Sequence, residues 1–549
     1  MKRRGIFALA MTMVLSMAAC GNAEGDSSGN NGAASDSAAQ TGGNVDSQSE
    51  SGENAGSAGN ASDAPAEDTA EIVVAYYCNG SNTSDVDEVE AAINAITVEA
   101  INTEVVLMPF QIGGYNEQMN LMISSNEQLD LAPTFFAGPT TFSAMTSQKQ
   151  LMPLDDLLEE YGQDILSTMK AEYMETTKLD GVTYAVPVNK DMVSNMYLAM
   201  RTDILEQIGM LEKAENLTSM SELTEILAAV KEQTDLVPMA PAGSQGNVTT
   251  FMPVLISDKF EDAVTYDKLI NDYIVAFTDE PDKVVNLFET EEYKAALQVV
   301  RDWYEAGYVY KDSATTEDNN YMFVKNDVAF AYFFAAENST YMDTVAQSGY
   351  EMTVLKIASA PVSTSTVNTI DWTIPVTSRE PEAAMKFLNL MYSNKEIIDL
   401  LNYGVEDVHY VVQEDGTYNF PEGVDSNNAG YFINMTWEIG NQYLAGLWDG
   451  SNPQTREISA ADNENPLLSP LIGFVADSTG LENEITAVTS VYNEYYKGLN
   501  CGILDLETEL PAFNEKLKSA GIDKMVESAQ TQLDAWYASQ DGAGESAEE

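Results

Sequence analysis

The residue types that most often carry catalysis are scarce in this chain. His409 is the one histidine, which leaves little general-base chemistry and no histidine-rich metal site. With 87 aspartates and glutamates, some pairs of carboxylates will lie at the spacing of a glycosidase active site by chance. The sequence therefore cannot identify a catalytic pair. Asp85-Val86-Asp87 lacks the rest of an EF-hand loop, and no Walker A loop, Gly-x-Gly-x-x-Gly or Gly-x-Ser-x-Gly motif is present. We therefore expect no catalytic residue, no metal and no cofactor.

A second set of side chains could bind a ligand, because they stand where predicted strands end or in predicted loops. Rings can pack on an apolar ligand face, and amides and carboxylates can form hydrogen bonds with its polar groups. The candidates are Asn79, Phe135, Phe136, Asn189, Asp191, Phe334, Glu337, Trp372, Trp437 and Phe474. For each ring the alternative is a place in a hydrophobic core, and for Asn79 a turn with Gly80.

The elements that must position these side chains alternate along the chain. Continuous apolar runs predict buried strands at 71–78, 105–110, 129–136, 196–200 and 327–334. Amphipathic stretches predict helices from Ser84, over 115–126, 221–232 and 291–305, and from Pro381. This alternation predicts an α/β fold with mostly parallel sheets, and the apolar stripes after residue 480 predict C-terminal helices.

Two short strands that end in proline are interpreted as crossings between two lobes. Asp180-Gly181 is a tight-turn dipeptide, and the apolar run after it ends at Pro187. A second short strand, near residues 370–374, ends at Pro375. The expected hinge residues are Val188, Asn189, Asp371 and Trp372, with a ligand bound in the cleft between the lobes.

The totals limit the class of protein. A chain of 549 residues is too long for one hydrophobic core, so at least two packed units are expected. The formal net charge of −61 repels nucleic acid and anionic lipid headgroups, and neither is an expected partner. A neutral or cationic ligand is compatible with this charge.

The N-terminus predicts export and anchoring. Basic residues precede an apolar run from Ile6 to Met17 that is too short to span a membrane. Met17-Ala18-Ala19-Cys20 is similar to a bacterial lipobox, with Met17 where Leu is usual, so residues 1–20 are predicted to be a lipoprotein signal peptide and Cys20 the lipidation site. The alternative is an ordinary secretory signal with a chance cysteine.

The segments at the two ends are polar. Residues 21–70 contain no aromatic and no basic residue, which predicts a disordered acidic stalk, and residues 541–549 form an acidic tail.

The two remaining cysteines, Cys78 and Cys501, could pair in an exported protein or could remain buried free thiols.

An ordered set of motifs resembles a known family. After the lipobox and the stalk come Asp180-Gly181-x-x-Tyr184-x-x-Pro187, Arg201-x-Asp203-Ile204-Leu205, Asp327-Val328-Ala329-Phe330, Pro381-Glu382-Ala383-Ala384 and Tyr403-Gly404-x-Glu406-Asp407-x-His409-Tyr410. The set resembles extracellular solute-binding lipoproteins of bacterial ABC importers, close to carbohydrate-binding family 1. Gly473-Phe474 and the last helices resemble the C-terminal domain of the LipO-like subgroup.

The resemblance implies a periplasmic-binding-protein type II fold, with two α/β lobes joined by a multi-strand hinge. Lobe one would comprise residues 71–188 plus 372–420, and lobe two residues 189–371 plus 421–540. In the family, rings at the Phe334 position and near Phe474 commonly pack on sugar, although this chain has Phe where Trp is often seen. The position of a third crossing is left open.

The implied function is solute capture at the outer face of the cell membrane. A lipid-anchored monomer would close its lobes on an oligosaccharide and deliver it to an ABC permease. Three alternatives remain open: a receptor for peptides, for which the acidic charge would suit a cationic ligand, a surface glycoside hydrolase, and a sensory receptor.

Overall fold

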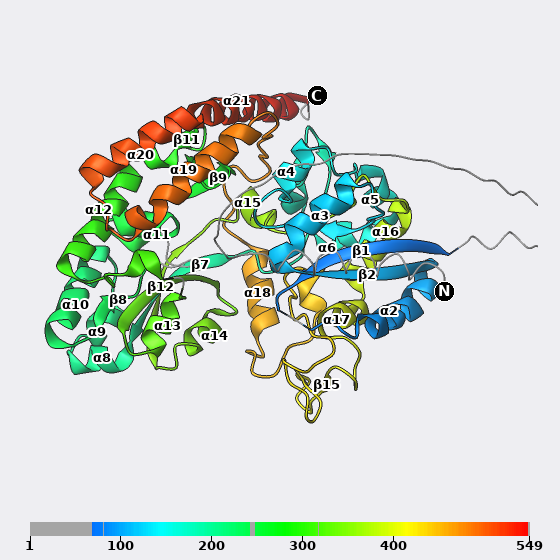
Figure 1. The fold of residues 1–549 in the computed structure, drawn as a ribbon, viewed down its shortest axis with the longest axis horizontal. Helices are drawn as coiled ribbons and strands as arrows, with labels where there is room; N and C mark the ends of the chain where they lie inside the picture. Colours follow the sequence, from blue (N-terminus) through cyan, green and yellow to red (C-terminus); the bar gives the residue numbers. More distant parts are fainter. Residues whose placement is uncertain (1–68, 81, 242–247, 317, 547–549) are drawn as a thin grey trace, which may run out of the picture. The chain divides into compact units, whose positions relative to one another are not determined.

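The computed structural model describes residues 69–80, 82–241, 248–316 and 318–546 (Figure 1). The predicted signal peptide, Cys20 and the predicted stalk up to residue 68 lie outside these residues. No helix within the described residues has both the length and the apolar character needed to cross a membrane.

The first group of strands surrounds β1. The strands are β1 (Ala70–Cys78), β2 (Thr103–Gln111), β3 (Ala132–Pro133), β6 (Val186–Pro187) and β14 (Asp371–Thr373). β1 pairs with β2 in parallel over nine residues, and a parallel bridge from Val74 to Leu131 links β1 to the segment before β3. β14 lies between β3 and β6 and is antiparallel to both.

The helices around these strands include the three that were predicted, from Ser84, over 115–126 and from Pro381, and six that were not. They are α2 (Val86–Ile101), α3 (Tyr115–Ser124), α4 (Phe142–Ser147), α5 (Asp155–Tyr161), α6 (Gln163–Thr168), α7 (Ala171–Glu175), α15 (Thr364–Val367), α16 (Pro381–Ser393) and α17 (Lys395–Tyr403). The predicted tight turn is present, because β4 (Lys178–Leu179) pairs with β5 (Val182–Thr183) around Asp180 and Gly181. Both turn residues have positive φ, at 53° and 78°, which matches the Asp-Gly preference.

Asp130 fastens the start of α16 to this group of strands. Its buried carboxylate accepts hydrogen bonds from Val73 N at 2.8 Å, Ser378 Oγ at 2.8 Å and Arg379 N at 2.7 Å. Two more donors complete the set: Gln128 Nε2 and Glu380 N. Hydrogen bonds of this kind compensate a buried carboxylate for the water that it loses on folding. In the same way, Asp130 replaces the water that the five donors would otherwise bind.

The second group of strands forms a four-stranded sheet. Its order is β13 (Met352–Ser359), β7 (Ser194–Arg201), β12 (Ala329–Glu337) and β8 (Val237–Met239). The helices beside it are α8 (Thr202–Gln207), α9 (Leu211–Glu215), α10 (Met220–Gln233), α11 (Val248–Ile256), α12 (Glu291–Ala306), α13 (Asn320–Lys325) and α14 (Tyr341–Ala346). A smaller antiparallel sheet contains β9 (Tyr266–Ile270), β10 (Ile274–Phe277) and β11 (Val285–Asn286).

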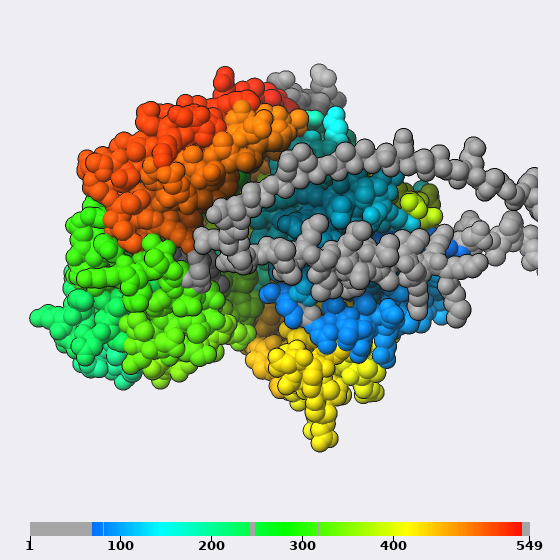
Figure 2. Space-filling model, viewed as in Figure 1, coloured from blue at the N-terminus to red at the C-terminus, as the bar shows by residue number. Residues whose placement is uncertain are grey.

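The C-terminal helices belong to this second group. They are α19 (Glu482–Asn500), α20 (Leu506–Ala520) and α21 (Ile522–Ser546). The helix before them, α18 (Thr455–Glu464), contacts the first group, since Lys170 Nζ donates to Glu464 O at 2.7 Å. In Figure 2 the last three, coloured orange to red, lie directly against the green segment that includes α12. Because α21 continues to Ser546, the predicted acidic tail from Asp541 is helical over most of its length.

Buried apolar side chains form two large clusters, which define the two lobes. Lobe one is built on the cluster that contains Ile72, Trp372 and Phe387. Lobe two is built on the cluster that contains Leu198, Phe333 and Leu533. Two separate hydrophobic cores are what the length of the chain requires.

The predicted boundary at residue 420 is wrong. Tyr431, Ile433 and Ile439 are buried in the core of lobe one, not of lobe two. The Tyr431 hydroxyl lies 2.8 Å from the Tyr76 hydroxyl, which places this segment beside β1. Residues 431–448 therefore complete lobe one after the predicted boundary.

Three crossings lie side by side between the lobes. Ala360 N donates to Ser194 O at 3.2 Å, which pairs the first crossing with the second. Val362 N donates to Leu467 O at 2.7 Å and Ser469 N donates to Val362 O at 2.9 Å, which adds the third. Asp371 and Trp372, predicted to be hinge residues, lie instead in the core of lobe one, because both neighbours of β14 belong to that lobe.

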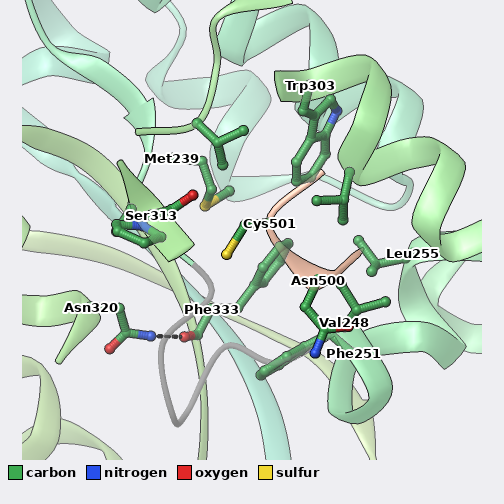
Figure 3. A pocket seen from close by; sticks show the side chains of 14 residues that line it. Met239, Val248, Phe251, Leu255, Trp303, Ser313, Asn320, Phe333, Asn500 and Cys501 are labelled. Atoms are coloured by element: carbon green, nitrogen blue, oxygen red, sulfur yellow. Dashed lines mark hydrogen bonds between the residues drawn. The ribbon is translucent and has the colours of Figure 1, made fainter. Parts of the chain in front are cut away.

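The two cysteines are free thiols in different lobes. Cys78 is buried in the core of lobe one. Cys501 lines a small cavity of lobe two with Trp303 and Phe333 (Figure 3), and the cavity volume of about 30 Å³ has room for a single water molecule. Of the two possibilities that the sequence left open, the structure shows the unpaired one.

Candidate ligand-binding site

Four aromatic rings meet where β1 and β3 end, and we call them the aromatic platform: Tyr77, Phe135, Phe136 and Trp437. Tyr77 contacts Phe135 edge-on at 5.2 Å between ring centroids and Trp437 at 6.2 Å, while Phe136 stacks on Phe135 at 4.1 Å. Tyr77 and Phe135 are buried, whereas Phe136 is 51% and Trp437 37% exposed. The platform thus presents two rings to solvent on a rigid buried support.

This arrangement suits a ligand with a weakly polar face. Rings held in place by other rings lose little side-chain entropy when a ligand packs on them. Tyr115 adds to the support, since its ring lies 4.9 Å from Tyr77 and 5.6 Å from Phe135. Asn79, which directly follows the end of β1, is exposed and can supply a hydrogen-bonding amide near the same edge.

Buried carboxyl groups lie beneath the platform. Glu438 accepts a hydrogen bond from Tyr77 N at 2.8 Å, and its backbone oxygen accepts one from Trp372 Nε1 at 2.8 Å. Burial raises the pKa of both Glu438 and Asp371 well above the ordinary range. Among the described residues, the Asp371 carboxyl oxygens and the Tyr77 hydroxyl have no hydrogen-bond partner.

Trp372, the predicted ring at the cleft floor, is a core residue. Its side chain is 1% exposed, and its indole N–H is already used by Glu438. Phe334 and Phe474 are also buried: Phe334 lies in a cluster with Tyr197, and Phe474 packs against Trp536 at 5.8 Å in the core of lobe two. These three rings cannot touch a ligand in this conformation, and the core alternative holds for each.

The first crossing is held by hydrogen bonds from both lobes. Asn189 N donates to Gly440 O at 2.9 Å, and its side-chain amide donates to Asn441 Oδ1 at 3.0 Å. Asp191 accepts a hydrogen bond from Ser339 Oγ at 2.9 Å, and burial raises its pKa to about 6. Both predicted residues therefore sit at the crossing, with their side chains already engaged within the protein.

Lys190, between Asn189 and Asp191 in the sequence, brings a basic side chain to the crossing. Burial lowers its pKa, and the nearby carboxylates of Glu337, Asp371 and Asp191 oppose that effect. The chain links the crossing to the platform, because Trp437 stands three residues before Gly440, whose backbone oxygen accepts the hydrogen bond from Asn189 N. The platform and the crossing are thus neighbouring parts of one site.

Lobe two contributes a polar group that the sequence did not predict. Asn338 accepts from Asn195 Nδ2 at 2.9 Å and from the Tyr197 hydroxyl at 2.6 Å, and it donates to Asp462 Oδ2 at 2.8 Å. Tyr341 stacks on Tyr197 at 4.9 Å with nearly parallel rings. The signal available in the sequence was the cluster of polar and aromatic residues after a buried strand, next to the predicted Glu337.

The half-buried Glu337 closes this group by accepting a hydrogen bond from Thr340 Oγ1 at 2.8 Å. Together, Glu337, Asn338 and Tyr341 place a carboxylate, an amide and a ring at the end of β12. Lobe one presents rings and the Asn79 amide at the ends of β1 and β3, so each lobe offers aromatic and hydrogen-bonding side chains.

A second cluster has the residue types of a metal site. Asp85, Glu88 and His409 place one ligand atom each within 4.8 Å of one another. His409 Nδ1 accepts a hydrogen bond from Val405 N at 2.9 Å, so a neutral imidazole carries its proton on Nε2. That nitrogen faces Asp85 Oδ2 at 3.5 Å and has no lone pair for a metal ion. The geometry thus fits a histidine–carboxylate contact.

Comparison with known proteins gives matches to two family models. The model described as "Bacterial extracellular solute-binding protein" matches residues 91–405. A domain of unknown function (DUF3502) matches residues 470–538, which include the helices α19 and α20 and part of α21. The first match covers more than half of the chain.

Relatives and solved structures agree with this match. A carbohydrate ABC transporter substrate-binding protein of Streptococcus pneumoniae serotype 4 is 25% identical over 480 residues, which are 87% of this chain and 93% of the relative. The N-glycan transport solute binding protein NgtS from Streptococcus pneumoniae superposes with a TM-score of 0.67 at 24% identity, covering 84% of this chain and 98% of NgtS.

A more distant solved structure shows the same fold. A solute binding protein from Bifidobacterium longum infantis, described as binding HMO and associated with an ABC transporter, has a TM-score of 0.58 at 15% identity, covering 85% of this chain and 99% of its own. The predicted fold, a type II solute-binding fold of two α/β lobes, is confirmed by these structures.

Proposed function

The chain belongs to the family of bacterial extracellular solute-binding proteins, and from this membership we propose that it captures an oligosaccharide between its lobes and delivers it to an ABC permease. The aromatic platform carries the proposal. Exposed Phe136 and Trp437 rings can pack on the C–H faces of sugar rings, while the amides and carboxylates at the crossing and at the end of β12 can bind hydroxyls.

The names of the similar proteins support a glycan in preference to a peptide. The relative from Streptococcus pneumoniae is named for carbohydrate transport, and NgtS has been solved in complex with Man5GlcNAc. An acidic chain would also tolerate a basic peptide, but the carboxyl groups beneath the platform, Glu438 and Asp371, are buried and their pKa values are raised, so they offer a basic peptide no exposed negative charge. We further propose that Cys20 is lipidated and that the protein is not an enzyme, since the sequence offers no catalytic set.

The decisive experiment is calorimetric titration of the mature chain with oligosaccharides, Man5GlcNAc among them, and with lysine-rich peptides. Oligosaccharide binding is expected, and Trp437→Ala and Phe136→Ala should each weaken it about 2- to 13-fold, which corresponds to 0.5–1.5 kcal/mol for one ring contact. Leu166→Ala removes a similarly exposed apolar side chain from helix α6 and should leave affinity unchanged.

Two results would contradict the proposal. One is binding of lysine-rich peptides with no response to any oligosaccharide. The other is platform variants that bind sugar as tightly as Leu166→Ala does. Release of shorter sugars during prolonged incubation would show catalysis and would favour the glycoside hydrolase alternative.

A further inference from the structure

A groove on lobe two, remote in sequence from the aromatic platform, is the feature that sugar capture leaves unexplained. It lies between the β10–β11 hairpin, the start of α12 and the first turns of α21, and it encloses about 1070 Å³. Figure 1 shows β11 beside α21. We call it the α21 groove.

The floor of the α21 groove is apolar. It is lined by Ile256, Val264, Phe277, Val285 and Val526. From α21 come Asp523, Val526, Glu527, Gln530 and Thr531, a spacing that places all five on one face of the helix. Val264 is 37% exposed, so part of this apolar surface faces solvent. A helix face and a hairpin thus flank an apolar channel.

The rim is strongly acidic. Its seven carboxylates are Asp279, Glu280, Glu289, Glu291, Glu292, Asp523 and Glu527, and Lys283 is the one basic residue among the lining residues. Glu291, Glu292 and Asp523 stand in the first turns of their helices, where a negative charge is favourable. Of the other four, Glu280 pairs with Lys283 at 3.2 Å and Glu289 with Lys518 at 2.6 Å. For Asp279 and Glu527, neither a helix start nor an ion pair among the described residues explains a position on the rim of an apolar channel.

One donor in the groove has no acceptor. Asn286 lines the groove and is 5% exposed, and its Oδ1 accepts a hydrogen bond from Phe288 N at 3.1 Å. Its amide nitrogen has no hydrogen-bond partner within the described residues. Buried amide nitrogens are normally paired, so this N–H suits an acceptor that an occupant would bring.

From these observations we propose that the α21 groove binds a segment of a partner protein in which lysine or arginine side chains flank apolar ones. The apolar floor accommodates the apolar side chains, the acidic rim pairs with the basic ones, and the Asn286 amide can donate to a backbone carbonyl of the segment. The volume exceeds that of a typical small-molecule pocket, which favours a peptide segment over a small cation. The acidic rim excludes nucleic acid and anionic lipid.

The test uses the full mature chain and a defined probe. The probe is a fluorescein-labelled 18-residue peptide with a leucine stripe flanked by lysines, and its affinity is measured by fluorescence anisotropy. The triple variant Asp279→Asn, Glu280→Gln and Glu527→Gln should bind about tenfold more weakly. The control variant Glu99→Gln, Glu104→Gln and Glu159→Gln removes the same charge from exposed positions of lobe one and should lose less than about twofold.

Hydrogen exchange gives the second readout. Bound peptide should protect residues 274–286 and 522–531 and should leave the platform segments unchanged. Equal weakening in both triple variants would show unspecific charge attraction and overturn the proposal. So would protection outside the groove, or full displacement of the peptide by spermine at matched charge, which would identify a small polycation as the occupant.

Discussion

Asp267 offers a quantitative test of how burial governs stability in lobe two. It lies in β9 with 5% of its surface exposed, and its carboxyl accepts a hydrogen bond from the Ser469 hydroxyl on the third crossing. Burial raises the pKa of Asp267 to about 6, and the Ser469 hydrogen bond only partly opposes this rise. An unfolded aspartate titrates near 3.9, so the folded state holds its proton to higher pH.

The sign of the effect follows from linkage. Because the folded state binds the proton more tightly, stability falls as pH rises from the unfolded pKa to the folded pKa. With values of about 3.9 and 6, this group lowers the free energy of unfolding by about 1.5 kcal/mol at pH 5 and about 2.8 kcal/mol at pH 7. Asp267→Asn keeps an acceptor for Ser469 and removes the titration.

The assay is urea unfolding of the wild type and Asp267→Asn at pH 5, 6 and 7. Any constant cost of the new amide group cancels when the difference between the two proteins is followed with pH. That difference should shift by about 1.3 kcal/mol in favour of the variant between pH 5 and pH 7. Measurements stay above pH 4.5, because the net charge of the chain approaches zero near its isoelectric point of about 4.1, where proteins tend to precipitate.

Asp279→Asn serves as the control, since it removes the same charge from an exposed position of the same segment. A difference for Asp267→Asn that stays flat with pH, or that runs parallel to the control, would refute the reasoning. It would mean that the Asp267 carboxyl is ionised in the folded protein despite its burial.

Two further predictions concern packing. Asp130→Ala leaves five donors without their acceptor and should lower the free energy of unfolding by about 3 kcal/mol or more, measured by urea unfolding at pH 7. Gly440→Ala should cost about 3 kcal/mol in the same assay, because φ is 52° and the new Cβ would lie 2.3 Å from Met391 O. Gly450→Ala, also at positive φ but with open space around it, should cost about 1–2 kcal/mol, and equal losses at the two glycines would contradict the packing argument.

The strands and helices were predictable where burial is continuous. β1 and β7 are buried along most of their lengths, so their apolar runs appear directly in the sequence. The Asp180-Gly181 turn was predictable because its φ values favour those two residues. Phe136 and Trp437 were named from their positions in strand ends and loops, and their exposure fits that choice, although their role in binding stays a prediction.

The misplaced hinge has a physical cause. Trp372 and Asp371 precede a proline as a crossing strand might, but their partners at residues 132–133 and 186–187 are set by long-range pairing. The same holds for residues 431–448, which have no periodic pattern and whose place in lobe one depends on contacts such as that between Tyr431 and Tyr76. Asn338 and Tyr341 were missed because their stacking and hydrogen bonds join residues up to 144 positions apart.

The position of β14 has a consequence for how the chain folds. Its strand completes the sheet between β3 and β6, yet it is synthesised only after the whole of β7 to β13. Until residue 373 is available, β3 and β6 lack the strand that joins them, and the buried face that Trp372 covers is open. Lobe one therefore cannot reach its native state as an early N-terminal unit. Lobe two is later still, because its core includes Leu499, Phe513 and Leu533 of the last three helices, so folding of both lobes should be slow.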